Sequence, residues 1–219
     1  MRINQYVAAA SDLSRRGADL AVAAGRVALA GQPAKAGQQV APGEVVTLDG
    51  RPLQPPTKHT YVTLHKPAGY VSSHAHQGEH PTLYELLPPG WRRLRLAGRL
   101  DRESSGLVLL SSDGPFIQRL SHPSNGKQKL YELTLARSLT AADAARLEQG
   151  VGLTDGLSVV EVIKTQGRQT TVALTQGRNR QLRRTFGALG YNIERLHRIS
   201  LGPYQLGELE PGAWREVRP

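Results

Sequence analysis

The chain has 219 residues, and 39% of them are hydrophobic, which is enough for a folded core and too many for a disordered chain. It has no cysteine, which excludes disulfides, thiolate zinc sites and cysteine nucleophiles. No apolar stretch approaches the ~20 residues that a membrane-spanning helix needs. The first residues carry Asp12 and paired arginines where a secretory signal would be apolar, so we expect a cytoplasmic protein that contacts no membrane.

The positive charge of the chain is unevenly distributed. Lysine and arginine outnumber aspartate and glutamate by 28 to 18, which gives a net charge of +10. Six arginines and one acid lie between Arg178 and Arg198, and five arginines and one acid lie between Trp91 and Arg102. Such clusters attract polyanions, because binding to phosphates releases counterions. A basic amphipathic helix with a large apolar face is not evident, so the charge favours nucleic acid over a membrane surface.

Residues 1–53 are predicted to form a small module of two helices followed by strands. Apolar residues at helical spacing predict the first helix: Ile3, Tyr6, Val7 and Ala10. Ser14 is expected to cap the second helix, which ends at Gly25. Residues 26–29 and 45–48 have the composition of strands. This module is too small for a typical enzyme, and we interpret it as a docking module.

The remaining chain is predicted to be a second, larger domain. Residues 54–59 contain consecutive prolines and predict a semi-rigid linker. Residues 60–219 are rich in predicted strands with interspersed helices. Alternating or continuous apolar residues predict strands in four segments, namely residues 62–65, 107–110, 131–135 and 171–175. We therefore predict an α+β fold with a mainly antiparallel sheet in the catalytic domain, preceded by a small α/β module.

Two helices of this domain have recognisable ends. Thr140 and Asp143 resemble a capping box, and the helix they begin is expected to end at Gly150. Asn179 is expected to cap a second helix that ends at Gly190 and has apolar residues along one side.

Two segments contain the residues best suited to chemistry. Residues 97–106 place Asp101 between two arginines on a loop that leads into a buried apolar run, although an ordinary surface turn with local ion pairs explains this composition equally well. Residues 176–184 form a loop that enters a helix, and three arginines there fall on one side, namely Arg180, Arg183 and Arg184. A helix N-terminus with arginines suits phosphate. A solvated basic face is disfavoured, because no acids are interleaved to balance the arginines.

Four segments, in order over residues 60–217, resemble motifs of the pseudouridine synthase family that acts on ribosomal RNA. They are HKPAGYVSS, GRLDRESSGLVLLSSDG, KLYELTL and GRNRQLRRTFGALGY, and the ending LEPGAWREV is similar as well. The early segment SRRGADLAVAAGRVALAG resembles the alpha-L RNA-binding domain of a small-subunit ribosomal protein, with Ala30 where asparagine is usual. The second resemblance implies that Arg15, Arg16 and Arg26 contact RNA.

The first resemblance implies that the chain isomerises one uridine to pseudouridine without a metal or organic cofactor. Asp101 would be the nucleophile, kept ionised by Arg183. Tyr131 would stack on the base and move a proton, although its spacing also suits a core tyrosine, and Leu182 would form an apolar wall or simply pack its helix. Lys66 would shape its loop or meet a phosphate. The residues expected around a flipped-out nucleotide are Arg99, Arg178, Asn179 and Arg180.

The sequence also allows other interpretations. Three histidines could suggest a metal site, but with Glu79 as the nearby acid an exposed loop is favoured for His74, His76 and His80. A ribosome-associated factor that binds RNA without chemistry is the main alternative, and Asp101 and Tyr131 argue against it. An RNA-cleaving enzyme would need a histidine pair or a carboxylate cluster. We expect a monomer that acts on ribosomal RNA or an assembly intermediate, with 23S RNA favoured over 16S RNA.

Overall fold

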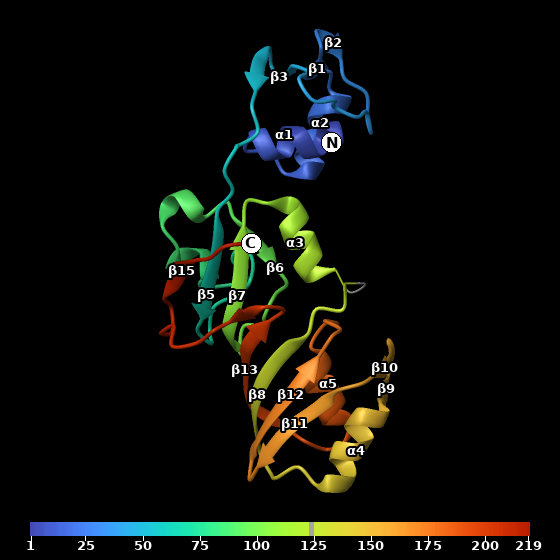
Figure 1. Ribbon diagram of the computed structural model, residues 1–219, viewed down its shortest axis with the longest axis vertical. Helices are drawn as coiled ribbons and strands as arrows, with labels where there is room; N and C mark the ends of the chain where they lie inside the picture. Colours follow the sequence, from blue (N-terminus) through green and yellow to red (C-terminus); the bar gives the residue numbers. More distant parts are fainter. Residues whose placement is uncertain (123–124) are drawn as a thin grey trace. The chain divides into compact units, whose positions relative to one another are not determined.

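The computed structural model describes residues 1–122 and 125–219, which form two compact units, Met1–His59 and Thr60–Pro219 (Figure 1). The boundary falls at the end of the segment that the sequence predicts as a linker. Within the described residues, no helix is both long enough and apolar enough to cross a membrane.

The first unit contains two helices and a small antiparallel sheet. The Ser14 hydroxyl accepts a hydrogen bond from the Gly17 amide at 3.0 Å and caps the second helix, as predicted. The strands follow the order β2-β1-β3-β4. The elements are α1 (Ile3–Ala10), α2 (Arg15–Ala23), β1 (Val27–Leu29), β2 (Gln32–Pro33), β3 (Val46–Leu48) and β4 (Arg51–Leu53). Apolar side chains from all of these elements except the two short strands β2 and β4 are buried in one core.

The second unit is built on a nine-stranded sheet with the path β11-β12-β8-β13-β7-β5-β15. Every pairing in it is antiparallel except that of β13 with β7, so the prediction of a mainly antiparallel α+β fold is confirmed. The strands on this path are β5 (Tyr61–Lys66), β7 (Ser105–Ser111), β8 (Lys129–Leu135), β11 (Glu161–Gln166), β12 (Gln169–Leu174), β13 (Ile193–Leu201) and β15 (Trp214–Glu216). Two shorter strands, β6 (Arg95–Ala97) and β14 (Tyr204–Gln205), pair with β7 and β13.

Both faces of this sheet are covered by apolar side chains. Along β7, Leu107 and Leu109 belong to a core with Phe116 and Leu120 of α3, whereas Val108 belongs to a larger core on the other side. The larger core includes residues of α4 and α5. The remaining elements are α3 (Gly114–Ser121), α4 (Ala141–Gln149), α5 (Gln181–Ala188), the hairpin of β9 (Val151–Leu153) and β10 (Gly156–Ser158), and the 3-10 helices η1 (Leu83–Leu86) and η2 (Pro89–Trp91).

One predicted helix cap differs from the structure, and a second forms at the predicted residue without the complete box. Helix α5 begins at Gln181, and its N-cap is Arg180 rather than Asn179. Arg180 has φ 45° and ψ 33°, a left-handed conformation that the sequence does not indicate. At α4, Thr140 accepts from the Asp143 amide at 3.1 Å, but its own amide donates to the Tyr191 hydroxyl instead of completing the predicted box.

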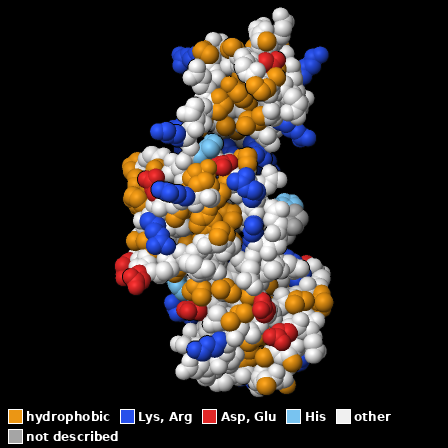
Figure 2. Space-filling model, viewed as in Figure 1, with side chains coloured by type: hydrophobic (Ala, Val, Ile, Leu, Met, Phe, Trp, Pro, Cys, Tyr) orange, Lys and Arg blue, Asp and Glu red, His pale blue; other side chains and the backbone are white. Residues whose placement is uncertain are grey.

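The arginine clusters of the sequence do not form one continuous basic surface on the face drawn in Figure 2. Lysine and arginine side chains are scattered there among apolar side chains.

Candidate active site

The loop that carries Asp101 connects β6 to β7 and is fixed by Lys66. The Lys66 side chain is fully buried at the end of β5. Its Nζ donates to main-chain oxygens of Pro67 at 3.1 Å, Asp101 at 3.1 Å, Arg102 at 3.3 Å and Ser104 at 2.6 Å. Burial lowers the pKa of Lys66 to about 8. A buried ammonium with four main-chain acceptors shapes the loop.

Two further contacts hold the same loop. The Ser72 hydroxyl donates to the Leu100 oxygen at 2.7 Å and accepts from the Leu100 amide at 3.2 Å. The Gly69 amide donates to the Arg102 oxygen at 2.8 Å. The segment HKPAGYVSS therefore supports the Asp101 loop from both sides, which gives this motif a structural explanation.

The Asp101 carboxylate faces a cavity of about 130 Å³. Its side chain is 29% exposed. Tyr131 of β8 and Leu182 of α5 line the same cavity and are buried, so the two residues that the sequence assigns to the base lie beside the acid. The other predicted residues that line it are Arg99, Arg178, Arg180 and Arg183.

Asn179 lies in an adjoining groove of about 370 Å³ instead of this cavity. Arg99, Asp101 and Arg180 line both spaces, so the acid lies where the cavity and the groove meet. Arg99 is exposed, and it makes no ion pair or hydrogen bond with the described residues.

The guanidinium that accompanies Asp101 is not the one that the sequence favours. Arg180 Nη1 lies 3.7 Å from Asp101 Oδ2 and 3.2 Å from Glu103 Oε2. Arg183 lines the cavity, but its Nη1 donates to the Ile193 oxygen at 2.9 Å, and its buried Nε has no partner among the described residues. The left-handed backbone of Arg180 turns its side chain toward Asp101. A prediction that assumes regular helical spacing does not include this turn.

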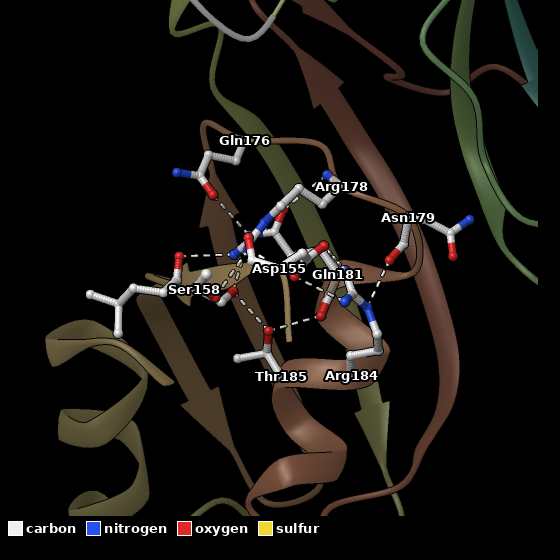
Figure 3. Close-up of polar contacts among 10 residues, drawn as sticks. Asp155, Ser158, Gln176, Arg178, Asn179, Gln181, Arg184 and Thr185 are labelled. Carbon is white, nitrogen blue, oxygen red and sulfur yellow. Dashed lines mark hydrogen bonds and ion pairs between the residues drawn. The ribbon is translucent and has the colours of Figure 1, made fainter. Parts of the chain in front are cut away.

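Arg178 has a structural task that differs from the predicted contact with phosphate. Its guanidinium donates to the Asp155 carboxylate at 2.9 Å and to main-chain oxygens of the β9–β10 turn. Arg184 donates to the same carboxylate at 3.0 and 2.8 Å. Figure 3 shows both guanidinium groups converging on Asp155. The sequence shows no acid interleaved with these arginines, but the fold supplies one from a hairpin more than twenty residues earlier.

Arg198 is a cavity residue that the sequence reasoning missed. It lies on β13 and is 1% exposed, and its Nε donates to the Leu107 oxygen at 2.8 Å. Its Nη2 is buried without a partner among the described residues. The sequence does contain an indication of this residue, because Arg198 lies among apolar residues of a strand, between Leu196 and Leu201. Burying a charge is costly unless it is paired, so a buried arginine indicates a specific role.

The arginines of the first unit that are predicted to contact RNA differ in whether they already bind an acid. Arg15 and Arg16 are exposed at the start of α2. Arg26 instead forms a two-point ion pair with Asp49, at 2.8 and 2.6 Å, so its guanidinium already has an anion.

The three histidines that follow the segment HKPAGYVSS, namely His74, His76 and His80, each contact another side chain. The His74 ring stacks on Tyr84 with centroids 3.7 Å apart, and burial lowers the pKa of His74. His76 approaches Glu85 at 3.9 Å, and His80 contacts Arg102. Among residues 1–122 and 125–219, no group of three potential metal ligands is found.

Comparison with known proteins decides the family. The family described as RNA pseudouridylate synthase matches residues 60–188, which include Asp101, Tyr131 and the whole of α5. The chain belongs to the RNA pseudouridylate synthase family. It is 33% identical to the ribosomal small subunit pseudouridine synthase A of Vibrio parahaemolyticus, with 98% of this chain and 95% of that protein covered.

Further relatives agree over nearly the whole chain. The dual-specificity RNA pseudouridine synthase RluF of Escherichia coli is 30% identical, and the match covers 99% of this chain and 75% of that protein. A solved structure described as a pseudouridylate synthase has a TM-score of 0.72 and 28% identity, and covers 100% of this chain and 96% of that one. The resemblance to pseudouridine synthases and the predicted class of enzyme are thus confirmed.

Proposed function

We propose that the protein isomerises a uridine of ribosomal RNA to pseudouridine, with Asp101 as the nucleophile. The observation that carries this proposal is the position of Asp101, on a rigidly anchored loop facing a cavity that Tyr131 and Leu182 also line. The family membership supports the reaction, and relatives named as ribosomal synthases support the substrate.

The reaction requires a carboxylate to act at the sugar of a flipped-out nucleotide. Asp101 attacks the ribose or stabilises its positive charge while the bond between N1 of uracil and the sugar breaks. The freed base turns within the cavity, and C5 joins the sugar and displaces Asp101 from any covalent bond that it has formed there. C5 then loses its proton and N1 gains one. Tyr131 stacks on the base and can transfer a proton, and Leu182 provides an apolar surface on which the base turns.

The arginines around the cavity divide the remaining tasks. Arg180 is the nearest cation to the Asp101 carboxylate in the described residues, at 3.7 Å, and helps to fix the position of that carboxylate. Arg183 and Arg198 each have a buried nitrogen without a partner, and a uracil oxygen or a phosphate can satisfy them. Arg99 is free to meet the phosphate backbone beside the flipped nucleotide.

The ribosomal subunit that holds the target is the finer part of the proposal. The C-terminal segment resembles large-subunit enzymes and so favours 23S RNA, whereas the relative above whose name gives a subunit is a small-subunit enzyme. We propose that the substrate is free ribosomal RNA or an assembly intermediate in the cytoplasm, bound by a monomer. The second candidate function is RNA binding without chemistry. It is disfavoured because Asp101 and Tyr131 line the same cavity.

Purified protein tests the substrate directly. The protein is incubated separately with 16S RNA, 23S RNA and transfer RNA transcripts, and pseudouridine is quantified by nuclease digestion and mass spectrometry. Formation of about one pseudouridine per molecule of one RNA supports the proposal. Conversion of transfer RNA alone would contradict the ribosomal substrate, and tight binding of either transcript without conversion would favour the binding-only function.

A further inference from the structure

Arg180 has a backbone conformation that its own sequence does not favour. Within the described part of Thr60–Pro219 it is the single non-glycine residue with positive φ. In this conformation the Cβ of an L-residue crowds the carbonyl oxygen, so the surrounding structure must hold the residue in place. The turn between β9 and β10 contacts the chain on both sides of Arg180.

Asp155 in that turn joins the two sides of Arg180. Arg178, two residues before Arg180, donates to Asp155 Oδ1 at 2.9 Å. Arg184, four residues after it, donates to both carboxylate oxygens, at 3.0 and 2.8 Å. The Arg184 Nε also donates to the Asn179 oxygen at 2.9 Å, which fixes the peptide that precedes Arg180. One carboxylate thus draws together the chain on both sides of the left-handed residue (Figure 3).

A buried polar network fastens the same hairpin to the start of α5. The Gln181 side chain accepts from the Arg178 amide at 3.1 Å and donates to Ser158 at 3.0 Å. Ser158 lies 2.8 Å from the Thr185 hydroxyl, which donates to the Gln181 oxygen. All three side chains are buried, so this network sets the distance between the hairpin and the helix. Asp155 adds the charged contacts of the hairpin, which are those with Arg178 and Arg184.

We propose that Asp155 is a positioning residue that fixes the turn at Arg180 and thereby directs the Arg180 guanidinium to Asp101. This inference rests on the proposed function of Asp101. Asp155 does not line the Asp101 cavity, whereas Arg180 does and lies 3.7 Å from Asp101 and 3.2 Å from Glu103. Hydrogen bonds from Arg184 hold the pKa of Asp155 below its usual value, so the carboxylate stays charged at neutral pH.

The substitution Asp155→Asn isolates this role with little change in size. An amide has one acceptor oxygen and an NH₂ group that opposes the guanidinium donors, so it cannot bind both arginines as the carboxylate does. We expect the single-turnover rate at saturating RNA to fall about tenfold, because the Arg180 charge is misplaced at the reacting centre. RNA affinity should change by about twofold or less. If the variant does not fold, Arg184→Gln removes the two Arg184 bonds to Asp155 and the Arg184 bond to the Asn179 oxygen, and leaves the bond from Arg178 to Asp155. A loss of rate of similar size is expected.

A double-mutant cycle distinguishes positioning from general stabilisation. If Asp155 acts through Arg180, the variant with Asp155→Asn and Arg180→Gln has the rate of Arg180→Gln alone. Additive losses, or a normal rate in Asp155→Asn, would overturn the proposal. Asp143→Asn is the matched control, because Asp143 binds Thr140, Arg146 and Tyr191 at the start of α4, so a lower melting temperature with an unchanged rate is expected.

The wild-type protein separates this inference from the proposed function. If the wild type converts no uridine in ribosomal RNA, the proposed function fails. A crystal structure of Asp155→Asn then still tests the positioning: movement of Arg180 out of the left-handed region supports it, and an unchanged Arg180 overturns it.

Discussion

At the scale of single residues, Lys66 links a buried charge to the geometry of Asp101. Substitution to methionine keeps most of the length of the side chain but removes the Lys66 donor from four main-chain oxygens. The oxygens of Asp101 and Arg102 keep the amides of Ser104 and Gly69 as donors, whereas those of Pro67 and Ser104 lose the Lys66 bond. Buried acceptors without partners are costly, so we expect Lys66→Met to lower the free energy of unfolding by about 2–4 kcal/mol. Chemical denaturation measures this loss, and single-turnover rates of the folded variant should fall as well. An active variant of normal stability would contradict the role of Lys66.

His197 makes the stability of the protein depend on pH. Burial, then the charge of Arg195 and the neighbouring His65, lower the pKa of His197 from 6.5 to about 4, and its Nδ1 lies 2.8 Å from the Ser105 hydroxyl. Between these values the unfolded chain binds a proton that the folded chain does not, so stability falls as the pH drops from 6.5 to 4. The shift corresponds to roughly 3 kcal/mol at about 1.4 kcal/mol per pKa unit.

The variant His197→Gln removes this titrating group. Urea denaturation at several pH values should show a flatter dependence for the variant than for the wild type between pH 4 and 6.5. Parallel curves for the two proteins would mean that His197 stays accessible to protons in the folded state.

The residues of the site divide into those that the sequence can predict and those that it cannot. Asp101, Tyr131 and Leu182 were placed together because each lies in a motif with an order and a spacing of its own. The partners of the arginines were not predictable, because Asp155 reaches Arg178 only through the fold. Arg180, and not the predicted Arg183, lies beside Asp101 for a similar reason. A left-handed residue cannot be recognised in a sequence when it is not glycine.

At the scale of elements, Gly106 explains how the parallel pair of β7 and β13 forms. Its φ is +112°, and a Cβ there would lie 2.2 Å from the Arg198 main-chain oxygen. The strands pair at this point, with Arg198 opposite Gly106. Substitution to alanine would force the two strands apart directly beside the Asp101 loop.

We expect Gly106→Ala to be among the most destabilising single substitutions in the chain, by about 4 kcal/mol or more. Gly167→Ala is the control, because its φ is +57° but nothing lies within 4 Å of the added Cβ. It should lose only about 1 kcal/mol, from backbone strain alone. Thermal melts of both variants compare the two, and equal losses would show that the strand contact is unimportant.

Element prediction succeeded where burial imposes a pattern and failed where it does not. Strands β5, β7, β8 and β12 contain buried apolar residues, and their positions were predicted. Strand β11 is an edge strand of mostly exposed residues and has no such pattern. The hairpin β9–β10 is held by polar contacts with α5 instead, so it was missed together with Asp155.

At the scale of the whole molecule, the two units have separate cores. The core of Met1–His59 contains no residue beyond Leu53, and the two cores of the larger unit begin at Tyr61. A chain of residues 60–219 should therefore fold with nearly unchanged melting temperature. If residues 1–59 bind RNA through Arg15 and Arg16, the truncated protein should bind ribosomal RNA more weakly.

The salt dependence of binding gives this prediction a sharper test. Each lost phosphate contact lowers the slope of log affinity against log salt by roughly 0.7–0.9, so losing two contacts should lower it by about 1.5. Unchanged affinity and slope in the truncated chain would argue against RNA binding by the first unit.

The nucleophilic role of Asp101 is the central claim, and pseudouridine mapping in cells tests it most directly. Carbodiimide treatment and primer extension on both ribosomal RNAs would compare cells with the wild-type protein, cells without it and cells with Asp101→Asn. We predict one stop that is present with the wild type and absent in the other two, while the purified variant still binds that RNA. A stop that persists with Asp101→Asn would contradict the claim.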